Sequence, residues 1–194
     1  MGCSRKLISI IHQICALAAS CRAEGGLSPR LLTERLRLKN CLAQLKQYPP
    51  PHTSESEHLV MVAEAKRLAA MLYLVDRVPL KEASTPNHSR ASQRSLVDAI
   101  IDALKLLPTT SAVSLWPLFV LGNSYLETDE QRHFVLDRLT QIEKRRRLGS
   151  VYHARRLVER KILSRVLASA GREHLVFSRR ERPLTENERW ISLA

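Results

Sequence analysis

The residues best suited to catalysis in this sequence are its histidines, acids and possible nucleophiles, and their spacing is uninformative. His133 and Asp137 stand four residues apart, which places both on one face of a helix, but a pair at this spacing is usually a surface contact. The sequence contains no HExxH, GxSxG or Gly-rich phosphate-binding motif. We therefore expect no catalytic residue and no enzyme activity.

The four cysteines are the candidate metal ligands, and they all fall in the first quarter of the chain. None forms a CxxC or CxxH pair, which is the usual half of a zinc site. We expect reduced, mostly buried thiols, with no metal and no cofactor. The residues are Cys3, Cys15, Cys21 and Cys41.

A basic stretch from Lys144 to Arg182 holds thirteen Lys or Arg residues and three Glu, in a chain whose formal net charge is +12. One interpretation is a phosphate-binding surface of a nucleic-acid-binding protein, with Lys144, Arg145, Arg146 and Arg147 serving as a nuclear-import cluster. The other is a solvated helix face. No groove-reading motif is present, which argues against direct recognition of DNA.

The first residues, MGCSRK, raise a third alternative, a lipid-anchored helical scaffold modified at Gly2 and Cys3. The myristoylation pattern needs Ser or Thr where this chain has Lys6, so an ordinary helix start explains the same residues. The chain has no apolar run of about 20 residues that could span a membrane. No membrane association is expected.

Apolar periodicity predicts helices almost everywhere and no strand, hence an irregular all-α domain of about seven helices. The predicted cap residues are Ser28, Thr128 with Gln131, and Ser150, and Gly149 is expected to close the sixth helix. Residues 48–58 and 79–92 read as polar loops. The expected helices cover residues 7–21, 29–45, 57–77, 96–104, 111–122, 129–148 and 150–170.

Two features of the predicted helices concern the core. The segment 111–122 is almost wholly apolar, so Trp116 and Phe119 are expected in the core rather than in a ligand pocket. In the last helix, Arg155 and Arg165 fall on the apolar face and must either reach the rim or find partners. One helical domain over residues 1–170, followed by a charged tail over residues 171–194, is the expected organisation.

Three stretches together resemble the fungal-specific transcription factor domain, the helical region that follows the zinc-cluster module in many fungal regulators. They are GCSRKLISIIHQICALA, AEAKRLAAMLYL and SLWPLFVLGNSYLETDEQRHFVLDRL, in the family's order. The last is the most specific. It includes Trp116, Pro117, Leu118, Phe119, Gly122 and Arg132.

The resemblance implies a non-enzymatic regulatory module in the nucleus. Its expected partners are proteins of the transcription machinery or a second copy of itself, and a small effector bound among its helices is a further expectation. The four cysteines cannot supply the six of the family's zinc cluster, so the DNA-binding module is expected to be missing. The Gly-Cys-Ser segment normally lies inside the family's domain, so the resemblance also implies an N-terminal truncation.

Overall fold

The computed structural model describes residues 5–46, 56–79, 86–146 and 149–169. Over these residues the chain forms seven α-helices and one 3₁₀ turn, with no strand, as the periodicity predicted. The elements are α1 Arg5–Ala23, α2 Pro29–Ala43, α3 Ser56–Arg77, α4 Pro86–Lys105, the 3₁₀ turn Ala112–Ser114, α5 Leu115–Asn123, α6 Asp129–Arg146 and α7 Gly149–Ser169.

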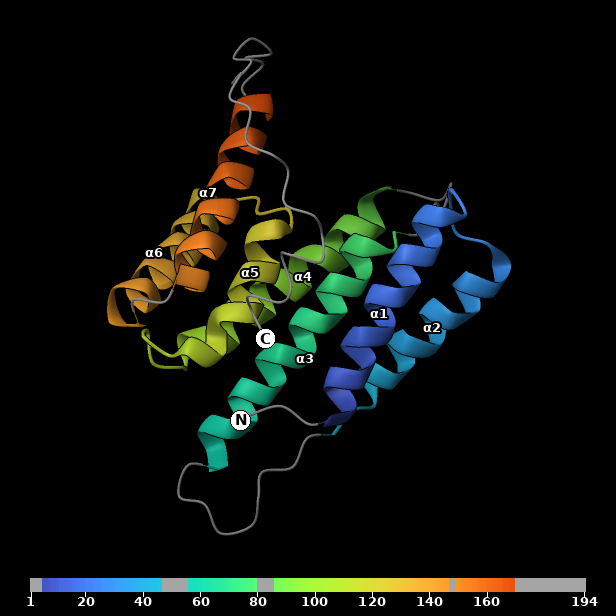
Figure 1. Ribbon diagram of the computed structural model, residues 1–194, viewed down its shortest axis with the longest axis horizontal. Coiled ribbons are helices and arrows are strands. Elements are labelled where there is room, and N and C mark those ends of the chain that lie inside the picture. The colour runs from blue at the N-terminus through green and yellow to red at the C-terminus, as the bar shows by residue number, and fades with distance from the viewer. Residues whose placement is uncertain (1–4, 47–55, 80–85, 147–148, 170–194) are drawn as a thin grey trace.

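The helices form two outer groups on a central one (Figure 1). The α1–α2 hairpin packs on α3, and α3 also packs against α4 and α5. On the other side, α5 contacts both α6 and α7, which pack on each other. The short α5 is therefore enclosed by three longer helices.

A single apolar core runs through all seven helices. Burial of these side chains supplies the main driving force for folding, because each large aliphatic side chain contributes roughly 1.5–3 kcal/mol when it leaves water. Twelve large side chains are almost completely buried: Leu7, Ile14, Leu38, Leu42, Leu72, Leu74, Ile100, Leu104, Leu118, Leu121, Leu139 and Ile142.

The expected loop between the third and fourth helices is partly wrong. Helix α4 begins at Pro86, so residues 86–92, which we placed in a loop, are helical. Proline suits the first turn of a helix because that turn needs no backbone donor. Residues 90–92, in the second turn of α4, are exposed, so they show no apolar stripe that periodicity could detect.

Three further predictions about helix boundaries and caps need correction. Gly149 is the first residue of α7 instead of the end of α6, so Ser150 lies inside the helix that it was expected to cap. Ser28 does occupy the position before α2, but its side chain makes no capping hydrogen bond. The predicted fifth helix is divided into the 3₁₀ turn and α5.

The core predictions for the apolar segment differ in outcome. Phe119 is buried, whereas Trp116 is only half-buried and packs against the edge of the core. The thiols of Cys15, Cys21 and Cys41 are free and only partly buried, so the expectation of mostly buried cysteines was too strong. Cys3 lies outside the described residues.

A candidate regulatory cleft

Helix α5 approaches α7 closely because Gly122 has no side chain. A Cβ atom at this position would overlap the side-chain methyl groups of Val158 on α7. Glycine thus allows the two backbones to come together, and the contact fixes the position of α7 over the end of α5.

The backbone after α5 is held from two sides. Ser124 donates a hydrogen bond from Oγ to the carboxylate of Asp76, near the end of α3. Arg165 on α7 donates to the carbonyl oxygens of Asn123, at 2.9 Å, and Ser124. A cation at this point favourably meets the negative end of the helix, so Arg165 has the partner that its place on the apolar face required.

Asp76 is the acidic residue at the centre of these contacts. Besides the Ser124 hydroxyl, its carboxylate accepts a hydrogen bond from Gln93 Nε2 on α4 at 2.7 Å. Burial raises the pKa of Asp76, while the Ser124 hydrogen bond and the positive charges of Arg165, Lys161 and Arg77 act in the opposite direction. The carboxylate therefore links α3, α4 and the turn after α5.

These contacts border two adjoining hollows of about 210 Å³ and about 350 Å³. Together they form what we call the α3/α5/α7 cleft, and they share Phe119, Asn123, Lys161 and Arg165. The smaller hollow is also lined by Tyr73, Asp76, Arg77, Gln93, Val120 and Tyr125, and the larger by Leu157, Arg160 and Ser164. Helices α3, α4, α5 and α7 line the smaller hollow, whereas α5 and α7 line the larger one.

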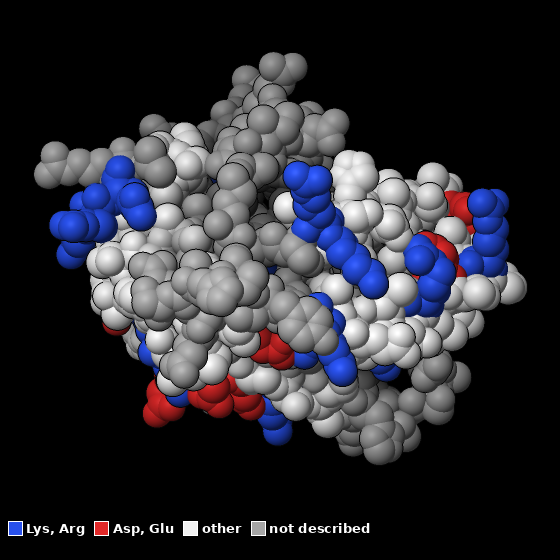
Figure 2. Space-filling model, turned by 90° about the horizontal axis from the view of Figure 1, so that it is seen from below, with Lys and Arg blue, Asp and Glu red and all other residues white. Residues whose placement is uncertain are grey.

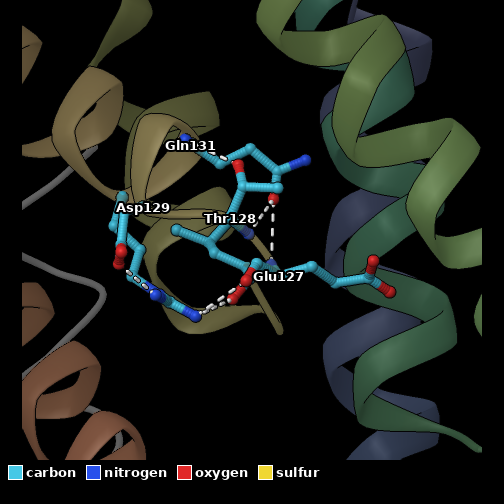
Figure 3. Close-up of polar contacts among 6 residues, drawn as sticks. Glu127, Thr128, Asp129 and Gln131 are labelled. Carbon is cyan, nitrogen blue, oxygen red and sulfur yellow. Dashed lines mark hydrogen bonds and ion pairs between the residues drawn. The ribbon is translucent and has the colours of Figure 1, made fainter.

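The turn between α5 and α6 completes the geometry (Figure 3). Gln131 N donates to Thr128 Oγ1 at 3.2 Å, and Thr128 N donates to Gln131 Oε1 at 3.3 Å, which is the predicted capping box. Arg132 donates to the carbonyl of Glu127 at 2.9 Å. The Glu127 side chain extends toward the neighbouring helices and pairs with Arg94 on α4.

A comparison with known protein families identifies the family of the chain. The family model of the fungal-specific transcription factor domain matches residues 1–160, which is most of the chain. The chain belongs to the fungal-specific transcription factor domain family. No curated protein and no solved structure matches it.

Membership of the fungal-specific transcription factor domain family gives the chain a role in transcription regulation. The sequence block from Ser114 to Leu139, which carried the resemblance most specifically, corresponds to α5, the capped turn and most of α6. In this member of the family the block provides the Gly122 contact, the turn that binds Asp76 and part of the cleft wall. Its residues therefore act mainly by packing and by positioning backbone.

The predicted import cluster does not line the α3/α5/α7 cleft. Lys144, Arg145 and Arg146 are exposed at the end of α6, and Arg147 lies outside the described residues.

The basic stretch as a whole is divided by the fold. Arg155 pairs with Glu143 and Glu159, whereas Lys161 and Arg165 line the cleft. On the face in Figure 2, the Lys and Arg side chains of the described residues lie in several separate groups, with acidic side chains beside some of them.

The remaining candidate catalytic and metal-binding residues form no site within the part of the chain that the structure describes. His133 and Asp137 are both exposed, as expected for a surface pair. Within the described ranges, no group of three or more His, Cys, Asp or Glu side chains could hold a metal ion. A search of the same residues finds no helix with the length and apolar character needed to cross a membrane.

The cleft itself was missed by sequence reasoning. Asp76 and Gln93 stand 17 positions apart and match no motif, and Asp76 simply follows an apolar helical run. The one available signal was Arg165, a charged residue on an apolar face, which had either to reach the rim or to find a partner.

Proposed function

We propose that this chain is the non-enzymatic regulatory module of a nuclear transcription regulator, and that it acts when an effector or a protein partner binds at the α3/α5/α7 cleft. The observation that carries the proposal is the coincidence of the family-specific block with the cleft wall. Phe119, Val120, Asn123 and Tyr125 belong to that block and line the cleft.

The physical basis is a shift between arrangements of the helices. Helix α7 is attached to α5 through Arg165, and α3 is attached to the same turn through Asp76 and Ser124. A bound molecule that contacts these groups favours the arrangement in which they are correctly placed, by as much as its affinity differs between arrangements. The altered helix surface is then what the transcription machinery, or a second copy of the chain, recognises.

A reporter assay tests the proposal. The chain is fused to a heterologous DNA-binding domain in fungal cells, and expression of a reporter is compared with that from the DNA-binding domain alone. We expect the fusion to change expression, and Asp76→Ala to alter that change because it releases the turn after α5. Lys39→Ala, at an exposed position on α2, is the control variant and should behave as the unaltered chain.

Protein abundance is measured in parallel, so that loss of the fusion is not mistaken for loss of function. A fusion that accumulates normally and leaves reporter expression identical to that of the DNA-binding domain alone would refute the regulatory role. Sedimentation of the purified chain separates the two partner classes, because self-association raises the mass with concentration.

A second candidate function, nucleic-acid binding through residues 144–182, is favoured by the exposure of Lys144, Arg145 and Arg146 at the end of α6. Charge alone would give binding that weakens steeply with salt and ignores base sequence. A fluorescence anisotropy titration with two unrelated duplexes at several salt concentrations tests this candidate. No binding near physiological salt eliminates it.

A further inference from the structure

The α3/α5/α7 cleft is richer in cations than in acids. Among the described residues, its lining includes Arg77, Arg160, Lys161 and Arg165 and one carboxylate, that of Asp76. Two of the four cations, Lys161 and Arg165, line both hollows. A concave surface with this balance holds a positive potential, because its low-dielectric walls focus the field of the charges.

The single carboxylate is already engaged by the protein. Asp76 accepts hydrogen bonds from the Ser124 hydroxyl and from Gln93 Nε2, and these hold it against the α3–α4 side of the cleft. Asp76 therefore neutralises part of the positive charge of the cleft. Because its carboxylate already accepts two hydrogen bonds from the protein, it is poorly placed to bind a cationic ligand as well.

Arg165 has the capacity to bind a ligand without releasing the turn. A guanidinium carries five N–H donors, and its bonds to the carbonyls of Asn123 and Ser124 come from Nη1 and Nη2 alone. These two carbonyls also fix the orientation of the guanidinium plane. A planar donor group held in this way suits a carboxylate or phosphate oxygen.

Apolar and neutral polar groups complete the lining. Phe119 is 4% exposed and is shared by both hollows, so it offers an apolar contact at their junction. The Asn123 amide and the Ser164 hydroxyl lie in the wall of the larger hollow. A volume of about 350 Å³ is at the lower end of the range found for small-molecule sites, about 300–1,000 Å³.

We infer that the α3/α5/α7 cleft binds a small organic anion, whose carboxylate or phosphate group lies between Lys161 and Arg165 and whose carbon skeleton covers Phe119. The inference rests on the proposed function, since it names the chemical class of the effector for the same cleft. Because Lys161 and Arg165 both lie on α7, beside the turn after α5, an anion bound between them changes the charge at the contact between α7 and that turn.

The test uses the full 194-residue chain and three defined probes: succinate, inorganic phosphate, and succinamide as the uncharged counterpart of succinate. Binding is followed by ¹H–¹⁵N NMR, which resolves the side-chain amide of Asn123 and the backbone amides around Arg165. We expect succinate or phosphate to shift these signals saturably in the millimolar range and succinamide to leave them unchanged. The two anions also distinguish a carboxylate site from a phosphate site.

Charge variants connect the shifts to the cleft. Lys161→Gln removes one cation from the exposed rim and should weaken the binding of the anion by about tenfold, which corresponds to loss of one charge-assisted hydrogen bond. Lys39→Gln, which removes the same charge from α2, should leave the affinity unchanged. Both positions are exposed, so both variants are expected to fold.

Three outcomes overturn the inference: no saturable shift with either anion, an equal response to succinamide, or equal weakening by Lys161→Gln and Lys39→Gln. Failure here is distinguishable from failure of the proposed function. A fusion that still changes reporter expression would leave the regulatory role intact with a partner of another class. Anion binding without any reporter effect would retain the site and reject the regulatory role.

Discussion

The two outer groups of helices each place a buried arginine on the end of a central helix, and the α6–α7 group adds a second arginine that lines a cleft. On the α1–α2 side, Arg35 of α2 donates from Nε to the carbonyl of Val78, just past the end of α3, at 2.6 Å. On the α6–α7 side, Arg138 of α6 donates to the carbonyls of Leu104 and Leu107 at the end of α4, each at 3.0 Å. Both guanidinium groups donate to carbonyls at or just past a helix end, where intrahelical donors run out.

Arg165 makes the same kind of contact at the end of α5, yet it lines a cleft. Arg35 and Arg138 are 4% and 9% exposed, whereas Arg165 is half-buried. Arg35 and Arg138 hold their carbonyls where almost no solvent reaches, whereas Arg165 holds its carbonyls at the wall of the α3/α5/α7 cleft, where we infer that an anion binds.

The largest effect should come from removing the dry arginines. Arg138→Met leaves the buried carbonyl of Leu107 without its donor, at a cost of about 1–3 kcal/mol, and removes one of the two donors to that of Leu104. Arg35→Met should destabilise through the carbonyl of Val78 in the same way. Arg165→Met should cost less, because Asn123 lines the cleft and water there can hydrogen-bond its carbonyl. Urea unfolding of the three variants measures the order.

Arg37→Met is the control for loss of an arginine, since Arg37 is exposed on α2, where it pairs with Glu34 across one turn and donates to Gln13 Oε1 of α1 at 2.6 Å. Exposed pairs of this kind contribute about 0.2–1 kcal/mol. If Arg165→Met were more destabilising than Arg138→Met, the distinction between the dry and the wet arginines would be wrong.

A smaller effect is expected from the pH dependence of Asp76. Burial raises its folded-state pKa above the ordinary value of 3.8, so the folded chain binds more protons than the unfolded chain between the two values. The contribution of Asp76 to stability is therefore greatest at low pH and is lost as the pH rises from about 3.8 through the folded-state pKa. Asp76→Asn should remove this part of the pH profile.

Urea midpoints of the unaltered chain and the Asp76→Asn chain, measured from acid to neutral pH, check this prediction. The difference between the two midpoints should change with pH in favour of the Asn variant as the pH rises. Parallel profiles would mean that the hydrogen bond from Ser124 and the nearby cations offset the burial of the carboxylate completely.

The smallest effect on stability should follow from neutralising the import cluster. Alanine at Lys144, Arg145, Arg146 and Arg147 removes cations near the end of α6, each worth about 0.3–1 kcal/mol at most through the helix dipole. We expect an unchanged helical circular dichroism spectrum and loss of nuclear accumulation of a large fluorescent fusion. Equal distribution of the two fusions would reject the import role.

Local chemistry made several features predictable. The capping box of Thr128 and Gln131 depends on residues three positions apart, and its two hydrogen bonds are present as expected. The apolar face of the last helix was also predicted correctly, because Val151, Ala154 and Val158 are buried at helical spacing. The start of α4 at Pro86 was missed because the segment PNHSRAS carries no periodic apolar signal.

The sequence by itself determined the all-helical class, most helix positions and the family, since these follow from periodicity, caps and one specific block. Only the tertiary structure decided that Asp76, Gln93 and Arg165 meet around the turn after α5. The reason is that helix formation depends on neighbours within a few residues, whereas this meeting depends on how three helices pack. The close contact of Gly122 with α7 belongs to the same class of fact, because the cost of a side chain there depends on a residue of another helix.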